Sequence, residues 1–385
     1  KACPGARARV FLGRAQPRES AACSACTSRR DFLKVSAQAL GLATLGGMRP
    51  TLRAQANPSA AGNILALIHL AGGNDGLNTV IPRGDDRYAV LRPTLAINPD
   101  QVLPLDDASG FHPACLGLHD LFMDGRLAVL NQVGAPAPNF SHFGALEQWA
   151  TGHTTARADT PGWIGRYFDE VPPSTGDPAA VHFSPALPAS LRCESEPEVF
   201  SFNAAPTDGL QVNRSVERIV AAFQPISEFP STVFAANLRR TAALIASGTK
   251  TPIYHLTLPG FDTHSHQAIP HAQLLRTLAE GLAAFDQELR YRRLDHRVLT
   301  LAWSEFGRSA RENERHGTDH GTFGPVFALG GKVRGGLIGA AQPASAEAVV
   351  PEIDFRAVYA TVLARWLQTD PELILGREFD LLDFV

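Results

Sequence analysis

The 385-residue chain has little of what would direct a protein into a membrane or onto a nucleic acid. No segment approaches the roughly 20 consecutive apolar residues that a transmembrane helix needs. Its 35 Lys and Arg residues face 38 Asp and Glu residues, which gives a net charge of −3, and the basic residues form no stripe. We therefore expect no nucleic-acid partner and no stable membrane span in the mature protein. The composition, 44% apolar and 19% charged, is that of a globular protein.

Cysteine is also scarce, with five residues in the chain. Near the start, Cys23 and Cys26 form a C-x-x-C pair that has no partner pair, so it predicts no metal site. Farther along the chain are Cys115 and Cys193. Two alternatives stay open for them: one disulfide in an oxidising compartment, or two separate buried thiols.

The N-terminal region carries an ordered set of targeting features. Residues 28–34 read S-R-R-D-F-L-K and contain the pair Arg29 and Arg30. A mildly apolar stretch follows over residues 35–48, and an A-x-A pattern then ends at Ala56. This order resembles a twin-arginine signal peptide, whereas an amphipathic helix with two arginines would not require all three features. The resemblance implies transport by the twin-arginine translocase and a periplasmic or secreted location.

Two parts of the chain follow from this interpretation. Residues 1–56 are expected to be the signal peptide, and residues 57–385 a single domain. Within that domain the residues 169–230 are rich in Pro and Ser and lack a clear period. We interpret them as an irregular insertion over the rest of the fold.

Short apolar runs alternate with helical patterns in the mature part. Long helices are expected at residues 270–290 and 355–367, with Asp354 as the N-cap of the second. Buried strands are expected at residues 64–70, 127–133, 252–258, 298–303 and 325–329. Strands that alternate with helices predict an α/β fold with a doubly wound, mostly parallel sheet and helices on both faces.

Polar residues follow the first two expected strands, where open parallel sheets bind ligands. Asp75 lies in the string G-G-N-D-G, and Asn139 and Ser141 lie in P-N-F-S-H-F. Taken alone, Asp75 is typical of a turn residue and Ser141 of a helix N-cap. The same helix N-terminus would also offer N–H groups and a positive dipole end to an anion.

The third expected strand is followed by a pattern with metal-binding chemistry. Asp262, His264 and His266 form D-x-H-x-H, and a carboxylate with imidazoles in one short loop is typical of a divalent-metal site. His320 lies in G-T-D-H-G, where no apolar neighbours would form a core around it. Eight other histidines lack such context and are interpreted as structural: His69, His112, His119, His142, His153, His182, His255 and His296.

The fourth expected strand is followed by Glu305 and Arg308, which have two interpretations. In the first interpretation, Glu305 and Arg308 form a simple ion pair. In the other, they belong to the same site as the preceding residues, because the carboxyl ends of parallel strands meet at one sheet edge.

These strings, taken in order, resemble a known family. G-G-N-D-G-L-N, P-N-F-S-H-F, G-F-D-T-H, S-E-F-G-R and G-T-D-H-G extend from Gly72 to Gly321, and they are similar to those of the exported family called domain of unknown function 1501. That family is grouped with the alkaline-phosphatase-like superfamily, which includes sulfatases and cofactor-independent phosphoglycerate mutases. The resemblance implies that fold and a site for divalent metals, with zinc, manganese, magnesium and calcium as candidates.

Position by position, the resemblance implies roles for individual residues. Ser141 would be the nucleophile, and Asn139 or Arg308 would contact the nonbridging oxygens of an ester. One metal would be held by Asp262, His320 and either His264 or His266.

A second metal would be held by Asp75, Ser141 and Glu305. In this chain the string after Glu305 continues with Phe306, where the superfamily has a histidine, and a phenylalanine cannot ligate a metal. The resemblance is therefore incomplete at the second metal position.

Two functions follow from these expectations. The first is hydrolysis or transfer of a phosphate or sulfate ester of a small molecule, which Ser141, Asp262, His264 and His320 favour. The second is a non-catalytic periplasmic or surface binding protein with a degenerate metal site, which Phe306 favours.

The signal-peptide interpretation predicts the outcome of a conservative double substitution. Replacing Arg29 and Arg30 by Lys keeps the charge but removes the twin-arginine pair. We expect the variant to stay in the cytoplasm with its N-terminal region uncleaved, as measured by fractionation and intact mass. Normal recovery of the processed variant outside the cytoplasm would contradict the interpretation.

Overall fold

A computed structural model describes residues 62–385 apart from residues 156–159, 174–175, 196, 203–209 and 346–349, and the side chains of residues 210–214 are also left out. The described residues belong to one compact unit. The expected signal peptide, including Arg29, Arg30 and the cleavage site after Ala56, lies outside the described residues.

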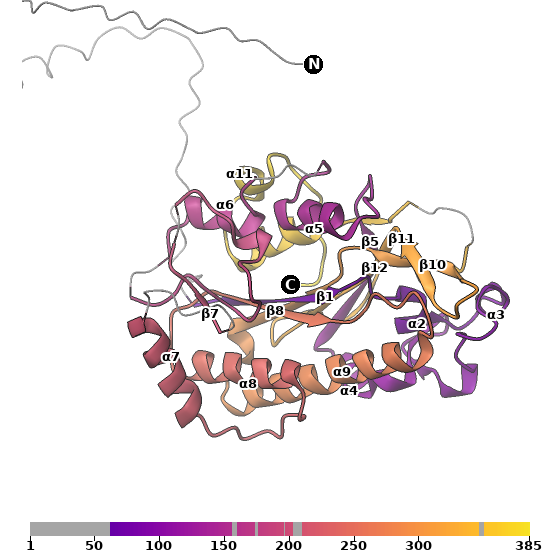
Figure 1. Ribbon diagram of the computed structural model, residues 1–385, viewed down its shortest axis with the longest axis horizontal. Coiled ribbons are helices and arrows are strands. Elements are labelled where there is room, and N and C mark those ends of the chain that lie inside the picture. The colour runs from indigo at the N-terminus through magenta and orange to yellow at the C-terminus, as the bar shows by residue number, and fades with distance from the viewer. Residues whose placement is uncertain (1–61, 156–159, 174–175, 196, 203–209, 346–349) are drawn as a thin grey trace, which may run out of the picture. The chain divides into compact units, whose positions relative to one another are not determined.

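A central sheet organises this unit (Figure 1). Its strand order is β13-β5-β12-β9-β1-β8-β6-β7, and β14 pairs with β5 beyond this path. The strands are β1 (Ile64–Ala71), β5 (Leu127–Gly134), β6 (Ala180–His182), β7 (Val199–Ser201), β8 (Ile253–Pro259), β9 (Val298–Trp303), β12 (Phe323–Leu329), β13 (Gly336–Ile338) and β14 (Ile353–Asp354). All run in one direction except β12, which is antiparallel to both β5 and β9. The prediction of a mostly parallel sheet is confirmed, and so are all five expected strands.

Helices cover both faces of the sheet, as the sequence predicts (Figure 1). One face carries α4 (Leu116–Met123), α7 (Leu210–Ala222), α8 (Val233–Ala246) and α9 (Ala268–Tyr291). The other carries α5 (His142–Thr151), α6 (Trp163–Glu170), α10 (Phe355–Thr361) and α11 (Pro371–Leu375). Among the described residues, no helix is long and apolar enough to span a bilayer.

Smaller elements complete the fold. The two-stranded sheet of β10 (Gly307–Glu312) and β11 (Thr318–Gly321) follows β9. The remaining elements are a three-stranded sheet of β2 (Val80–Pro82), β4 (Ser109–Phe111) and β3 (Leu103–Pro104), the short helices α2 (Gly76–Thr79) and α3 (Arg87–Leu91), and the 3-10 turns Pro99–Gln101, Pro113–Cys115, Ala189–Leu191 and Asp295–Arg297.

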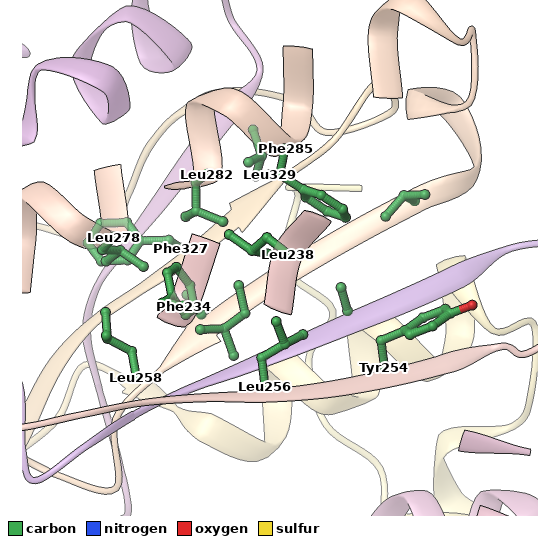
Figure 2. Packing of buried hydrophobic residues seen from close by; sticks show 14 of the residues in the cluster. Phe234, Leu238, Tyr254, Leu256, Leu258, Leu278, Leu282, Phe285, Phe327 and Leu329 are labelled. Atoms are coloured by element: carbon green, nitrogen blue, oxygen red, sulfur yellow. The ribbon is translucent and has the colours of Figure 1, made fainter. Parts of the chain in front are cut away.

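The long helix α9 shows why the apolar spacing predicts helix and packing together. Leu278, Leu282 and Phe285 recur at intervals of three and four residues, so they share one face and are fully buried. Figure 2 shows this face against Leu238 of α8 and Leu256 of β8. Each such side chain contributes about 1.5–3 kcal/mol by leaving water.

The expected helix at residues 355–367 consists of α10 followed by a π-helical turn at Val362–Trp366. Its expected N-cap is confirmed, because the carboxylate of Asp354 accepts a hydrogen bond of 2.9 Å from the backbone N–H of Arg356. Asp354 also ends β14 beside β5, so the cap fixes where this helix leaves the sheet.

Residues 169–230 differ from expectation. They contain two strands of the central sheet, since β6 pairs with β8 and β7 pairs with β6, and they also contain α7. The interpretation as an irregular insertion is wrong in this respect, because three-residue strands are too short to show a period in the sequence. Nearby, Cys193 is partly buried, and it is not bonded to Cys115, which lies in the core.

A buried histidine makes the stability of this sheet sensitive to acid. His255 lies on β8, and its Nδ1 atom has no hydrogen-bond partner among the described residues. Burial, together with the nearby His69 and His182, lowers the pKa of His255 to about 3. The folded protein thus keeps this imidazole neutral at a pH where the unfolded chain, with a histidine pKa near 6.5, binds a proton.

We therefore expect acid to destabilise the protein through His255. The stabilisation is fully present above about pH 6.5, the pKa in the unfolded chain, and is lost as the pH falls toward the pKa of His255 in the folded protein. At one pH unit below the unfolded pKa, the free energy of unfolding has fallen by about 1.4 kcal/mol. Urea unfolding at pH 7.5 and 5.5 should show a smaller loss in His255→Leu than in the wild type. The exposed His296, replaced by Leu, is the control and should leave the pH dependence unchanged. Equal losses in all three proteins would rule out this assignment.

Candidate metal centre

The site lies where several strands end on one edge of the sheet. His142 is the first residue of α5, which follows β5, while Asp262 and His264 follow β8. His320 lies on β11, opposite Arg308 on β10. Segments far apart in the sequence thus meet because their strands are parallel neighbours or are joined through β12.

Four side chains converge at this edge. Ligand atoms of His142, Asp262 and His320 all lie within 4.8 Å of one another. The Nε2 atoms of His142 and His320 are 3.5 Å and 3.4 Å from the two carboxylate oxygens of Asp262. His264 joins them, because its Nε2 lies 3.0 Å from Asp262 Oδ1 and 3.0 Å from His320 Nε2. Three imidazole nitrogens therefore face one carboxylate.

The outer nitrogens of two of these imidazoles, those of His142 and His320, face hydrogen-bond acceptors. Nδ1 of His142 is 3.0 Å from Glu305 Oε1, and Nδ1 of His320 is 2.7 Å from the carbonyl oxygen of Phe140. Nδ1 of His264 lies 3.4 Å from Asp319 Oδ1 but makes no hydrogen bond among the described residues. A proton on the outer nitrogens of His142 and His320 leaves their inner Nε2 atoms free to bind a cation, which is the usual arrangement of histidines that ligate metals. The residues present therefore fit a metal ion.

The types of ligand atom reduce the number of candidate metals, which were zinc, manganese, magnesium and calcium from the sequence. Three nitrogens and one carboxylate suit zinc or manganese, whereas magnesium and calcium prefer oxygen ligands alone. His142, Asp262 and His320, with His264 beside them, are the residues that would hold the ion.

Glu305 contacts the cluster from the protein interior, through the outer nitrogen of His142. Its carboxylate accepts hydrogen bonds from the backbone N–H of Gly72 at 2.9 Å and contacts His69 Nε2 at 2.9 Å, in addition to His142. Burial alone would raise the pKa of Glu305, but the hydrogen bonds and charge of His69 and the bond to His142 outweigh it and hold the pKa at about 2. The structure therefore places Glu305 as an anchor for His142.

Arg308 is enclosed by protein acceptors. Its guanidinium is fully buried and donates to the carbonyl oxygens of Gly73, Phe261 and Thr318 as well as to Asp262 Oδ1 at 2.6 Å. Burial tends to raise the pKa of Asp262, but the hydrogen bond and charge of Arg308 lower it. Arg308 thus holds Asp262 ionised, and its donors are directed at the protein and not toward a bound ester.

Asp75 is also enclosed, in a separate network. Both of its carboxylate oxygens bind the guanidinium of Arg92, at 2.6 Å and 3.0 Å, and the side-chain amide of Gln267 also donates to it. Burial tends to raise the pKa of Asp75, but Arg92 lowers it by charge and hydrogen bonding. Because Asp75 and Glu305 are both occupied by protein partners, the structure does not assemble the expected second metal site.

Two further expected residues lie beside the cluster and not within it. His266 is exposed, has a positive φ of 46°, and its ring is directed toward His316. Of the two histidines that the sequence predicts as alternative metal ligands, His264 and His266, only His264 lies in the cluster. Asn139 uses its side-chain oxygen to accept the backbone N–H of Ser141 at 2.9 Å, so it shapes the loop.

Ser141 occupies the N-cap position of α5, but its hydroxyl makes no capping hydrogen bond. The residue is exposed and directly precedes His142. The simple capping role that the sequence allows is therefore not what its side chain does.

His142 and His69 are functional candidates that sequence reasoning missed. The position of His142 in the string P-N-F-S-H-F, next to Ser141, is a sequence feature that indicates a functional role. His69 has none, because it lies in an apolar strand and its partner Glu305 is 236 residues away. Phe306 packs against both imidazoles, with its ring centroid 4.2 Å from that of His320 and 5.0 Å from that of His142, while the two imidazole centroids are 4.7 Å apart.

The fold and site together define an α/β protein with a histidine-rich candidate metal centre at the edge of a mostly parallel sheet. The model of the family described as protein of unknown function (DUF1501) matches residues 179–381, which is more than half of the chain, and the protein belongs to this family. A comparison with curated proteins finds no match.

Three solved structures are similar to this chain at low sequence identity. A protein of the alkaline phosphatase superfamily from Vibrio parahaemolyticus is 9% identical, with a TM-score of 0.41 over 83% of this chain and 71% of its own. The sulfatase PsFucS1 from Pseudoalteromonas sp. is 10% identical, with a TM-score of 0.41 over 87% and 75%. The lipoteichoic acid synthase LtaP from Listeria monocytogenes is 8% identical, with a TM-score of 0.36 over 74% and 68%. Similarity at this level does not transfer an activity.

The geometry predicts which residues control metal content. Purified protein should carry about one equivalent of zinc or manganese, and His142→Ala, Asp262→Ala or His320→Ala should remove it and lower the melting temperature. Elemental analysis and thermal unfolding with and without added metal measure both effects.

The control is His266→Ala, which changes a histidine of the same loop that lies outside the cluster and should leave the metal content unchanged. Glu305→Gln should weaken metal affinity by roughly 10- to 100-fold, because it loosens His142. A wild type without metal, whose melting temperature no divalent ion raises, would overturn the assignment.

Proposed function

We propose that the protein is an exported, metal-dependent hydrolase or transferase of phosphate or sulfate esters. The observation that carries the proposal is the convergence of three imidazole Nε2 atoms on Asp262, two of them on rings, those of His142 and His320, whose outer nitrogen is hydrogen-bonded to an acceptor. The order of motifs that resembles the alkaline-phosphatase-like superfamily supports the same chemistry. When bound, a divalent metal polarises an ester oxygen and lowers the pKa of an attacking hydroxyl.

The protein's own residues would divide the remaining tasks. His142, Asp262 and His320 hold the ion, with His264 beside them, and Glu305 orients His142. Ser141 is the proposed nucleophile, supported by its position next to His142 and by a hydroxyl that is not used to cap α5. Asn139 fixes the backbone of Ser141 through a 2.9 Å hydrogen bond, which supports a positioning role.

The N-terminus of α5 supports an anionic substrate. The first backbone hydrogen bond within this helix runs from Ala145 to the carbonyl of Ser141, so the preceding N–H groups point out of the helix. The positive end of the helix dipole stabilises a phosphate or sulfate group there.

The second candidate function is that of a non-catalytic binding protein. It is favoured by the ion pair that engages both oxygens of Asp75 and by Phe306, which packs against His142 and His320 and offers no metal ligand. Such a protein would hold one metal and a ligand without turning it over.

Export by the twin-arginine route, and a periplasmic or secreted location, are part of the proposal. They are supported by the ordered features of residues 28–56. A route for folded proteins suits a site that binds its metal before transport, because metal binding and folding are coupled.

Replacement of Ser141 by Ala separates the two functions. A missing nucleophile should lower turnover by at least about 1,000-fold, whereas a lost cap costs only about 1 kcal/mol of stability. Aryl phosphates, phosphodiesters and aryl sulfates should be assayed with zinc and with manganese, alongside elemental analysis and melting temperature.

The control for this comparison is Ser265→Ala, which changes an exposed serine next to His264 and should retain activity. Wild-type turnover that survives in Ser141→Ala would remove Ser141 as nucleophile. Absence of turnover on every substrate, with one equivalent of metal bound, would instead support the binding protein.

A further inference from the structure

Two phenylalanines lie exposed beside the candidate metal centre. Phe140 is 48% exposed and Phe143, the second residue of α5, is 88% exposed. Single apolar residues on a surface are common, but these two flank His142 within four consecutive positions. An apolar pair beside a charged cluster is a typical anchor for an apolar part of a ligand.

The exposure does not come from a frayed chain end, because this loop is fixed on several sides. The backbone N–H of Asn139 donates to Gln148 Oε1 at 3.1 Å, and Asn139 Oδ1 accepts the N–H of Ser141. The carbonyl of Phe140 accepts from His320 Nδ1 at 2.7 Å. The backbone that carries both rings is thus bonded to α5 and to a residue of the metal cluster.

A buried aromatic side chain supports the imidazoles of the cluster. Phe306 is 3% exposed, and its ring contacts the rings of both His142 and His320. Because Phe306 is buried against these imidazoles, the apolar surface open to a ligand of the cluster is that of Phe140 and Phe143.

We propose that Phe140 and Phe143 form a stacking surface for a flat aromatic ring in the alcohol half of the ester, so that the substrates are aryl phosphates or aryl sulfates. The inference rests on the proposed function, because it takes the metal cluster as the place of the anionic group. Aromatic rings stack on phenylalanine with a preference worth about 3- to 10-fold in affinity.

The test measures binding of non-hydrolysable anions to the full-length, metal-loaded protein by calorimetry. Phenylphosphonate should bind about 3- to 10-fold more tightly than methylphosphonate, and benzenesulfonate should show the same preference over methanesulfonate if the protein takes sulfates. In Phe143→Ala the phenyl-to-methyl ratio should fall toward 1 while the metal content stays unchanged. The matched control is Val233→Ala, at another exposed apolar residue in the first turn of a helix, which is 79% exposed on α8.

The outcomes separate this inference from the function on which it rests. If methyl and phenyl anions bind equally and Phe143→Ala changes neither, the stacking surface is wrong and the ester site stands. If no phosphonate or sulfonate binds, both are wrong. If Phe143→Ala instead changes the oligomeric state in sedimentation or the retention on lipid vesicles, and leaves the ratio unchanged, the rings contact a second copy or a membrane and the inference is overturned.

Discussion

The buried guanidinium of Arg308 is the interaction on which the candidate site depends. It comes from β10 and binds carbonyl groups after β1, after β8 and on β11, so one side chain ties together the segments that carry the site. A buried charge is costly unless it is paired and fully hydrogen-bonded. Here Asp262 supplies the counter-charge, which also fixes the carboxylate that faces His142 and His320. The chain after β1 must pass close to Arg308 and Phe306, and it does so at Gly73. This residue has a φ of +88°, and a Cβ there would lie 2.5 Å from the ring of Phe306.

Two arginine–carboxylate pairs lie at this edge of the sheet, and their difference explains where a metal fits. Arg92 engages both oxygens of Asp75, and neither side chain is exposed. Arg308 engages only Oδ1 of Asp262, whose side chain remains 48% exposed with Oδ2 facing His142. The first pair is closed by its own charges, whereas the second leaves one carboxylate oxygen for a ligand. The sheet edge therefore offers one metal position built from the described residues.

The sequence predicted the parts of this arrangement that depend on local pattern. The apolar runs of β1, β5, β8 and β9 and the spacing within α9 determine the sheet and one of its covering layers. The short strands β6 and β7 escaped prediction, because three residues carry no period and their pairing with β8 is set by tertiary contact.

The candidate site was predictable in the same uneven way. D-x-H-x-H pointed to the correct loop, but only the backbone conformation shows that His264 enters the cluster and His266 turns away. The partners of Asp75 and Glu305 could not be predicted, because Arg92 and His69 reach them through the fold and no sequence spacing marks either pair.

A site with one cation has a consequence for the chemistry we propose. Two-metal sites stabilise both the attacking and the leaving oxygen of a transferred group. Here Asp75 is neutralised by Arg92 and Phe306 offers no ligand, so no second cation is available from these residues to stabilise the leaving oxygen. Turnover would then favour esters whose alcohol carries negative charge well by itself. Aryl oxides do so because the ring delocalises the charge, and the exposed Phe140 and Phe143 lie on either side of Ser141 and His142 in the chain. The single-metal geometry and the aromatic rim thus favour the same class of substrate for independent physical reasons.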